Sequence, residues 1–406
     1  MMLKGKNSSK IILLVIITLA IRIVFSNLPS FEYDENAYRI WSARLVEKGP
    51  SQFYSTQFFT NNPLGGLYAF WFMGLFKNTF LPNLSFFSGN FDLLLKLPAN
   101  IADIISAILI FVLIRKRMGP KWATAGFLMY ALNPALVFNS SVWGQYDGLS
   151  TLFLLISIFM IFIKKIPELA TLSLATALVI KPQAIFFVPA FIILILLTVK
   201  PLRWFSSLLT FFITTLVLYL PFFPTNPIYG LFYVNRNSVN LFNCTSCFAF
   251  NFWGIFGNWQ NDLQNFTNIP FAYWGAILLF TTLLLILLVK PLALKFKPPY
   301  FYLTTAISIM AFFMLLTRMH ERYLFSFFPF LLLAAIMLKS KILTFFYILI
   351  STLHLLNLYL PYAYYNNHAK VTNLPINYLV NNFQVFSFIS FLSFIILILY
   401  YFFYVK

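Results

Sequence analysis

The stretch LLLKLPANIADIISAILIFVLIRKRMG (residues 93–119) sets the class of this protein. Most of this stretch belongs to an apolar run, 91–114. As a helix, this run is long enough to cross the hydrocarbon core of a bilayer, which is about 30 Å thick. Three basic residues, 115–117, follow directly. An apolar span that ends in a basic group is typical of a membrane helix with a cytoplasmic loop. Asp103 lies inside the span, where an ionisable side chain needs either a function or a packing partner.

The composition of the 406-residue chain leads to the same class. Hydrophobic residues make up 61% of it, aromatic residues 20% and charged residues only 9%. Soluble domains carry about 25% charged residues, so an ordinary cytosolic enzyme is excluded. The net charge of +18 does not indicate nucleic acid as a partner, because the basic residues form short groups between apolar stretches, as in cytoplasmic loops. We expect a polytopic membrane protein.

Apolar runs that could form membrane spans recur along the whole chain. They lie near 10–27, 91–114, 121–139, 148–163, 167–180, 182–199, 203–220, 271–289, 299–316, 323–338, 342–361 and 383–404. A further candidate, 63–80, begins with PLGG and is rich in aromatic residues, which suits an interfacial helix. If it stays at the outer surface, most of the 28 basic residues fall on the cytoplasmic side. The sequence therefore predicts one all-α domain over 1–406 with about 12 (11–13) transmembrane helices and both termini in the cytoplasm.

This topology leaves two large segments outside the membrane, 28–90 and 221–270. The first holds three of the chain's ten acids within four residues, Glu32, Asp34 and Glu35. Apolar residues then recur at helical spacing, at Ala37, Ile40, Trp41, Leu45 and Val46. We expect an amphipathic helix on the outer leaflet. The acids either cap this helix or belong to an extracytoplasmic active site.

Two further polar features lie at the predicted outer ends of spans. The segment WGQYDG (143–148) supplies Gln145, Tyr146 and Asp147, and as a simple alternative it is a polar turn. Lys181 stands between two spans, on the side where the positive-inside rule disfavours lysine. Both features become candidates for substrate contact if the active site lies outside.

A cluster of charged residues follows another span, in TRMHERYLF (317–325). It consists of Arg318, His320, Glu321 and Arg322. Guanidinium forks match phosphate oxygens, so two Arg and a His within five residues predict an anion site. The alternative is an outer loop with a local Glu–Arg pair. Glu321 could also pair with one Arg when no anion is bound.

The two cysteines, Cys244 and Cys247, lie in the second outer segment. They could close a small disulfide in that compartment or remain free thiols. The chain has only three His and scattered acids, so no metal-ligand spacing is visible. No metal site and no cofactor are predicted, although a divalent metal is not excluded.

A carboxylate base and an Arg/His phosphate clamp at one membrane surface suggest group transfer from a phosphate leaving group. Soluble activated sugars are not normally present outside the cell, so the donor would have to arrive in the membrane. A sugar on a polyprenyl phosphate meets this condition. Its acceptor would be a hydroxyl of a lipid, a glycan or a protein.

Several strings also carry a family resemblance. An Asp-Glu pair in the first outer loop followed by an amphipathic helix resembles the GT-C superfamily of integral-membrane glycosyltransferases. Further strings resemble mannosyltransferases related to the second GPI mannosyltransferase: LKLPANIAD (95–103), NPALVFNSSVWGQYDGL (133–149), KPQAIFFVP (181–189), FNFWGIFG (250–257) and MHERYLFSFFPFLL (319–332). They run in family order over roughly 30–335, and WGQYD with HERY is the most specific combination. The last two spans carry no such string.

The resemblance implies a GT-C-type bundle and inverting transfer of a mannose-like hexose, usually without metal. By the family pattern, Asp34 would be the catalytic base, with Glu35 beside it. The donor phosphate would be bound by Arg318, His320, Arg322 and Lys181. The substrates would be bound or oriented by Glu32, Gln145, Tyr146, Asp147, Asp103 and Glu321.

Two other functions stay open at this point. A transporter or flippase of lipid-linked sugars would also carry an intramembrane acid and outer cations, but it predicts inverted repeats, which are not visible. An O-antigen-type polymerase or ligase would need an Arg/His-rich outer loop, and 221–270 has one Arg and no His. The site is expected on the extracytoplasmic face of a prokaryotic plasma membrane, or of the ER membrane in a eukaryote.

Overall fold

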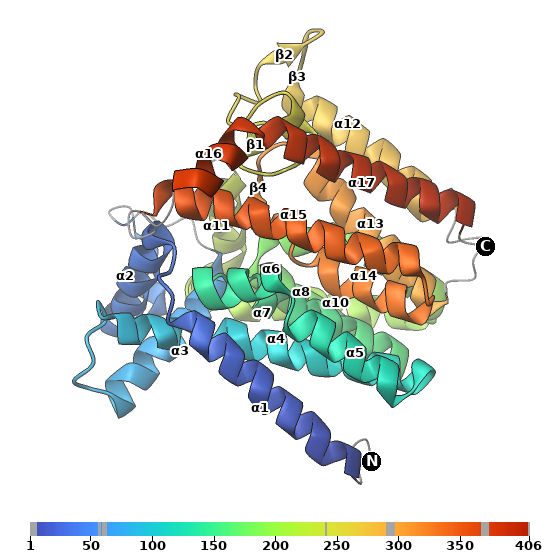
Figure 1. The fold of residues 1–406 in the computed structure, drawn as a ribbon. Coiled ribbons are helices and arrows are strands. Elements are labelled where there is room, and N and C mark those ends of the chain that lie inside the picture. Colours follow the sequence, from blue (N-terminus) through green and yellow to red (C-terminus); the bar gives the residue numbers. More distant parts are fainter. Residues whose placement is uncertain are drawn as a thin grey trace.

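The computed structural model describes residues 6–55, 58, 63–239, 242–289, 297–366 and 373–404, which form an all-α membrane protein (Figure 1). Seven helices of this described part are long and apolar enough to cross a bilayer. They are Gly89–Met118, Asp147–Lys164, Leu202–Tyr219, Phe271–Leu288, Pro298–Leu315, Lys341–Tyr365 and Phe383–Phe403. The predicted class, a multi-pass helical membrane protein, is confirmed.

Helices occupy all twelve apolar runs of the sequence. They are α1 (Lys6–Ser26), α4 (Gly89–Met118), α5 (Pro120–Ala131) with α6 (Pro134–Val137), α7 (Asp147–Phe159), α8 (Pro167–Ile180), α9 (Val188–Thr198), α10 (Leu202–Tyr219), α12 (Phe271–Leu284), α13 (Pro298–Leu315), α14 (Phe327–Met337), α15 (Lys341–Tyr365) and α17 (Phe383–Tyr404). The remaining α-helices and strands are α2 (Glu32–Lys48), α3 (Leu64–Phe80), α11 (Pro227–Val239), α16 (Asn373–Asn381), β1 (Ser246–Cys247), β2 (Asn265–Phe266), β3 (Ile269–Pro270) and β4 (Met319–His320). Segment 63–80 is thus a helix.

Proline and glycine set several helix boundaries. Pro120, Pro167 and Pro298 each stand in the first turn of a helix, where the missing N–H has no intrahelical acceptor to lose. Gly119 follows α4 at φ +83°, a left-handed conformation that glycine adopts without strain. The chain therefore turns directly from α4 into α5, and these two helices pack side by side.

The centre of the bundle is formed by α13 and α14. All residues of α13 from Phe301 to Leu315 are buried, and so are those of α14 from Phe327 to Ile336. By contrast, α10 buries only Ser207, Thr215 and Tyr219. A helix that is apolar on all sides must be surrounded by protein or by lipid. Here α13 and α14 are surrounded by protein, whereas α10 leaves most of its apolar surface for lipid.

The loops gather at two opposite ends of the bundle. At one end, Lys116, Arg117 and Lys165 line a basic cavity of about 490 Å³ together with Pro298. Helix α7 ends near this cavity and α13 begins there. At the other ends of these helices, the segments before α7 and after α13 line a cavity together with α2, which lies on the left of Figure 1, opposite the start of α1 and the end of α17. The loops predicted as inner and outer therefore separate in space.

A buried ion pair joins α1 to the bundle. Arg22 Nη1 lies 2.7 Å from Asp103 Oδ2, and both side chains have no solvent exposure. Arg22 Nε also donates to the carbonyl oxygen of Ala131, at 3.0 Å. Gly148 packs against the acid so closely that a Cβ there would lie 2.3 Å from Asp103 Oδ1. Asp103, predicted as a substrate-orienting residue or a packing residue, thus connects α1, α4, α5 and α7.

Replacing Asp103 by Asn should strongly destabilise the protein. The change leaves the Arg22 guanidinium without its counter-charge in the core, and loss of one partner of a buried pair costs about 3–5 kcal/mol. Thermal unfolding in detergent measures the effect. Glu47→Gln is the control, because its pair with Lys48 is exposed and should add nothing measurable. Equal melting temperatures for the two variants would contradict a structural role of the pair.

Candidate functional site

A cavity of about 490 Å³ opens between α2, α3, the end of α8 and α11, and the segments before α7 and after α13 complete its wall; we call it the site cavity. Its polar lining consists of Asp34, Gln145, Lys181, Gln183, Asn235, Ser238, Thr317, Arg318, His320 and Arg322. Aromatic side chains form much of the remaining wall: Tyr38, Trp41, Phe70, Tyr146, Phe186, Phe242 and Tyr323. Ligand sites are typically apolar clefts of about 300–1,000 Å³ with a few convergent polar groups, and this cavity fits that description.

Asp34 reaches the site cavity from the first turn of α2. This helix begins at Glu32, and its N-cap residue Phe31 makes no side-chain capping bond. The three acids therefore lie inside the helix and not before it, where its N-terminal partial charge favours carboxylates. The buried face of α2 comprises Tyr38, Trp41, Ser42 and Leu45. Ile40, which the sequence places on the apolar face of this helix, is 44% exposed and lies outside its buried face.

Two donors from the loop before α7 hold the Asp34 carboxylate. Trp143 Nε1 donates to Asp34 Oδ2 at 2.8 Å, and Gln145 Nε2 donates to the same oxygen at 2.5 Å. Gly144 stands between these donors at φ +87°, where the chain leaves a π-helical turn. The left-handed glycine lets residues on both sides of it point at one carboxylate. No described residue donates to Asp34 Oδ1.

Lys181 extends this network at the end of α8. Its Nζ donates to Gln145 Oε1 at 3.0 Å and to Asp147 Oδ2 at 2.9 Å. Asn139 Nδ2 donates to the same Asp147 oxygen, at 3.2 Å. Burial lowers the pKa of Lys181, and the Asp147 carboxylate opposes this shift. Lys181 therefore lines the site cavity with two hydrogen-bond acceptors inside the protein.

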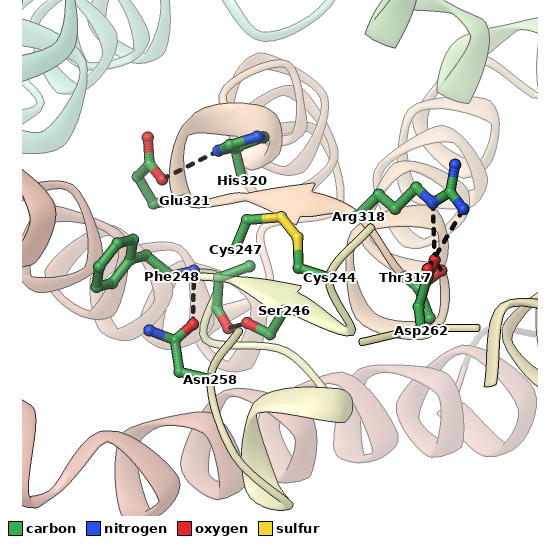
Figure 2. Close-up of a disulfide and its surroundings, with 11 residues drawn as sticks. Cys244, Ser246, Cys247, Phe248, Asn258, Asp262, Thr317, Arg318, His320 and Glu321 are labelled. Atoms are coloured by element: carbon green, nitrogen blue, oxygen red, sulfur yellow. Dashed lines mark hydrogen bonds and ion pairs between the residues drawn. A yellow bond between two sulfur atoms is a disulfide. The ribbon is translucent and has the colours of Figure 1, made fainter. Parts of the chain in front are cut away.

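The second large loop fixes Arg318 at the rim of the site cavity (Figure 2). Strand β1 pairs in parallel with β4, and the backbone N–H of Arg318 donates to the carbonyl oxygen of Cys244 at 2.8 Å. Arg318 Nε lies 2.7 Å from Asp262 Oδ2, which also accepts from the Thr317 hydroxyl at 2.9 Å. Cys244 and Cys247, left open by the sequence, form a disulfide beside this contact.

Arg322 and His320 share the carboxylate of Glu321. Arg322 Nη1 lies 2.7 Å from Glu321 Oε1, so the pair suggested by the sequence is formed. His320 Nδ1 lies 3.8 Å from the other oxygen. Burial would raise the pKa of Glu321, but Arg322 and His320 outweigh it and lower the value to about 2. Burial lowers the pKa of His320, and the Glu321 carboxylate opposes this shift.

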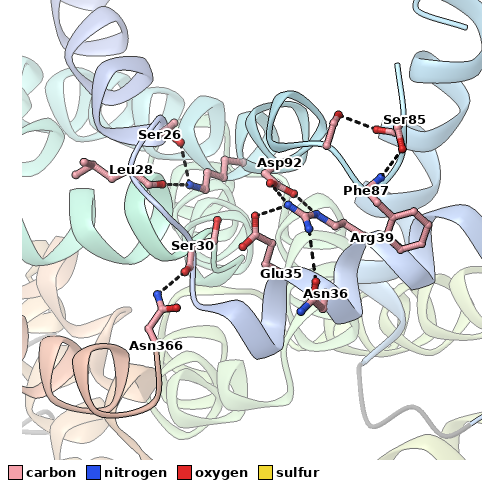
Figure 3. Close-up of polar contacts among 12 residues, drawn as sticks. Ser26, Leu28, Ser30, Glu35, Asn36, Arg39, Ser85, Phe87, Asp92 and Asn366 are labelled. Atoms are coloured by element: carbon pink, nitrogen blue, oxygen red, sulfur yellow. Dashed lines mark hydrogen bonds and ion pairs between the residues drawn. The ribbon is translucent and has the colours of Figure 1, made fainter. Parts of the chain in front are cut away.

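Glu35 points away from the site cavity, into a second polar cavity of about 600 Å³ that Glu32 also lines (Figure 3). Arg39 Nη2 lies 2.8 Å from Glu35 Oε1, and the same guanidinium makes a bidentate contact with Asp92 at the start of α4. Arg39 and Asp92 were not among the predicted site residues. The only sequence signal was the i,i+4 spacing of Glu35 and Arg39. Arg39 thus connects Glu35 on α2 to Asp92 on α4, and Glu35 does not face the same space as Asp34.

The stability of the protein should depend on pH through Glu35. Burial, followed by the Asp92 carboxylate, raises the pKa of Glu35 from 4.5 to about 8. A raised folded-state pKa gives stability that is complete below about pH 4.5 and is lost as the pH rises through 8. Glu35→Gln resembles the protonated acid at every pH. Its melting temperature relative to wild type should therefore rise from pH 5 to pH 9, and a constant difference would contradict the shift.

The structure brings part of the predicted site together. The residues that line the site cavity are Asp34, Gln145, Tyr146, Lys181, Arg318, His320 and Arg322. Asp147 and Glu321 lie behind it as partners of its cations, whereas Glu32, Glu35 and Asp103 lie elsewhere. Trp143 and Asp262 were not predicted as site residues. For Trp143, the sequence signal was an indole N–H donor directly before the GQYD string.

Among the described residues, no group of three or more His, Cys, Asp or Glu side chains could hold a metal ion. No family model matches the sequence, and no curated protein matches it either. The chemistry of the site cavity is therefore inferred from its own residues: a carboxylate with one oxygen held by Trp143 and Gln145, two guanidinium groups and an imidazole.

Proposed function

We propose that this protein is an inverting glycosyltransferase of the GT-C type, which moves a mannose-like hexose from a polyprenyl phosphate to an acceptor hydroxyl. One observation carries the proposal: Asp34 shares a single cavity with Arg318, His320 and Arg322, although about 280 residues separate the acid from the cations. A base and a phosphate clamp in one cavity are what transfer from a phosphate leaving group requires.

The proposed reaction is a single displacement. The acceptor oxygen attacks the anomeric carbon and gives its proton to Asp34 Oδ1. The bond between the anomeric carbon and the phosphate oxygen breaks, and its electron pair stays on that oxygen. The lipid phosphate leaves with an added negative charge. Trp143 and Gln145 hold Asp34 Oδ2 during this step, so that the other oxygen faces the acceptor.

The leaving phosphate would be bound by Arg322 and Arg318, with His320 as a hydrogen-bond donor. Both guanidinium groups carry a permanent charge, and their forks suit phosphate oxygens. Each already has a carboxylate partner, Glu321 or Asp262, which fixes its position in the wall of the site cavity. A phosphate bound beside these ion pairs would place its negative charge next to two guanidinium groups that are already fixed in position.

An apolar groove next to the site cavity supports a lipid as the donor. The groove has a volume of about 460 Å³, lies between α3, α4, α7, α8 and α10, and shares Ile180 with the site cavity. Gly65 keeps α3 close to this shared wall, because a Cβ there would lie 2.2 Å from the Ile180 Cα atom. A prenyl chain could leave the site cavity along this groove while its phosphate stays with the cations.

Twelve membrane spans with both termini in the cytoplasm complete the proposal, with α2 and the site cavity on the extracytoplasmic side. Single-cysteine labelling should reach Gln52→Cys only from outside and Lys116→Cys only from the cytoplasm. Both positions are exposed, and the two native cysteines are held in a disulfide. Labelling of both positions from the same side would contradict this topology.

The proposed activity is tested with purified protein and a panel of radiolabelled polyprenyl-phosphate sugars. Transfer of label, or slow hydrolysis without an acceptor, is the expected result. Reconstituted vesicles in the same assay would show whether the lipid-linked sugar crosses the bilayer unchanged. Translocation without transfer or hydrolysis would favour a transporter and contradict the enzyme.

A further inference from the structure

We propose that Lys181 is a positioning residue, which fixes the Gln145 amide so that its NH₂ group holds Asp34 Oδ2 and leaves Oδ1 to accept a proton. The sequence suggested a phosphate contact for Lys181, and the structure gives it other partners. The inference rests on the proposed function, because Asp34 is the base there. It adds a residue that acts on the base through a second side chain.

The orientation of the Gln145 amide follows from its two neighbours. A lysine ammonium can only donate hydrogen bonds, and an ionised carboxylate can only accept them. Lys181 Nζ lies 3.0 Å from one end of the amide, and Asp34 Oδ2 lies 2.5 Å from the other. The oxygen of the amide must therefore face Lys181, which leaves its NH₂ group to donate to Asp34.

Asp147 holds the lysine in this position. Its Oδ2 accepts from Lys181 Nζ at 2.9 Å and from Asn139 Nδ2 at 3.2 Å. Both side chains of the ion pair are mostly buried, with exposures of 14% for Lys181 and 6% for Asp147. The ammonium is therefore held between a fixed carboxylate and the Gln145 amide.

Other charged groups also surround Asp34, and their influence on its carboxylate must be distinguished from that of the Gln145 amide. The groups that interact electrostatically with Asp34 are Tyr38 on its own helix, Lys181 after α8, and His320 and Arg322 after α13. Glu32 and Glu35 on α2 face the second polar cavity, and Asp147 lies behind Lys181. Removing Lys181 changes both the amide and one of these charges.

A double-mutant cycle separates the two effects. Lys181→Met removes the donor to Gln145 Oε1, so the amide can turn and present its oxygen to Asp34. Two facing acceptors favour protonation of the acid. In a Gln145→Leu background no amide is present, and Lys181→Met can then act on Asp34 only through its charge. In the wild-type background, we expect Lys181→Met to shift the titration midpoint of Asp34 clearly to higher pH. In the Gln145→Leu background, the same change should shift this midpoint much less.

Trp143 provides a readout that does not depend on catalysis. Its indole N–H donates to Asp34 Oδ2, so the fluorine signal of a 5-fluorotryptophan at this position should follow the ionisation of the acid. The chain has eight Trp, and Trp143→Phe identifies the signal. The pH titration of this signal should vanish in Asp34→Asn, which ties it to the acid.

In this experiment, Lys181→Met should raise the titration midpoint of the Trp143 signal by about one pH unit, as expected when a hydrogen bond to the ionised form is lost. Lys181→Arg keeps a donor and a charge and should restore much of the midpoint. Lys77→Met is the matched control, because Lys77 is also buried but contacts Asn78 and Pro82 instead. Its midpoint should equal that of wild type.

Equal shifts in both backgrounds would overturn the inference, because Lys181 would then act only through its charge. An unchanged midpoint together with a raised KM for the lipid donor would overturn it too, in favour of a phosphate contact. Failure of the proposed function is seen separately, as a wild-type protein that transfers no sugar while the fluorine titration still responds to Lys181.

Discussion

Asp34→Asn should lower the turnover of sugar transfer by about 10²–10⁴-fold, the range expected for loss of a general base. The Asn side chain has nearly the same shape, and its carbonyl oxygen can still accept from Trp143 and Gln145. The NH₂ group then replaces Oδ1, the oxygen that would take the acceptor proton. Donor binding should be retained, because the change removes the proton acceptor and leaves the cations in place.

The neighbouring acid provides a matched comparison for this variant. Glu35→Gln makes the same chemical change one residue later, but Glu35 contacts Arg39 outside the site cavity. Its loss of turnover should be far smaller than that of Asp34→Asn. Steady-state kinetics with a radiolabelled donor and a donor-binding assay measure both variants. Unchanged turnover in Asp34→Asn would remove Asp34 from the role of base, and a larger loss in Glu35→Gln would move the role there.

Arg322→Ala should cost about 2–4 kcal/mol of transition-state stabilisation, by analogy with loss of a donor to a developing oxyanion. Negative charge grows on the lipid phosphate as the sugar–oxygen bond breaks, and Arg322 offers a permanent charge at the site cavity. Arg322→Lys keeps the charge but loses the planar fork, so it should be impaired to a smaller extent. The measurement is kcat/KM with a short-chain polyprenyl-phosphate sugar.

Arg322→Ala could also lower activity by leaving the Glu321 carboxylate without its ion-pair partner. This carboxylate is buried, and Arg322→Ala leaves it without its nearest cation. The double variant Arg322→Ala with Glu321→Gln removes both charges and should remain impaired if Arg322 binds phosphate. Recovery of kcat/KM in the double variant would mean that Arg322 serves only to neutralise Glu321. Arg203→Ala, in the Arg203–Glu168 pair at the other end of the bundle, controls for the loss of an Arg–Glu contact.

The sequence does not show which of the two neighbouring acids, Asp34 or Glu35, faces the site cavity. Both stand in one acidic string, and the string alone predicts one cluster. Successive residues of a helix point about 100° apart, so the two carboxylates leave α2 on different sides. The rotation of α2 about its axis directs Asp34 toward the loop before α7 and Glu35 toward the second polar cavity. The packing of α2 against its neighbours, which a sequence pattern does not define, therefore decides which acid belongs to the site cavity.

The sequence by itself determined the membrane class, the positions of the helical segments and the strings that supply the site cavity. These features depend on local properties, namely the length of apolar runs, the basic groups that end them and the proline and glycine residues at their boundaries. The alternation of short loops also separated the segments into two sets, which the structure places at opposite ends of the bundle.

Only the tertiary structure decided which side chains meet. The pairs Arg22–Asp103, Arg318–Asp262 and Lys181–Asp147 join residues 81, 56 and 34 positions apart. In a membrane helix, apolar residues serve both lipid and protein contacts, so hydropathy does not reveal that α13 is central and α10 peripheral. The packing of the helices determines which charged side chains form ion pairs. It also determines the contacts by which Lys181 orients the Gln145 amide.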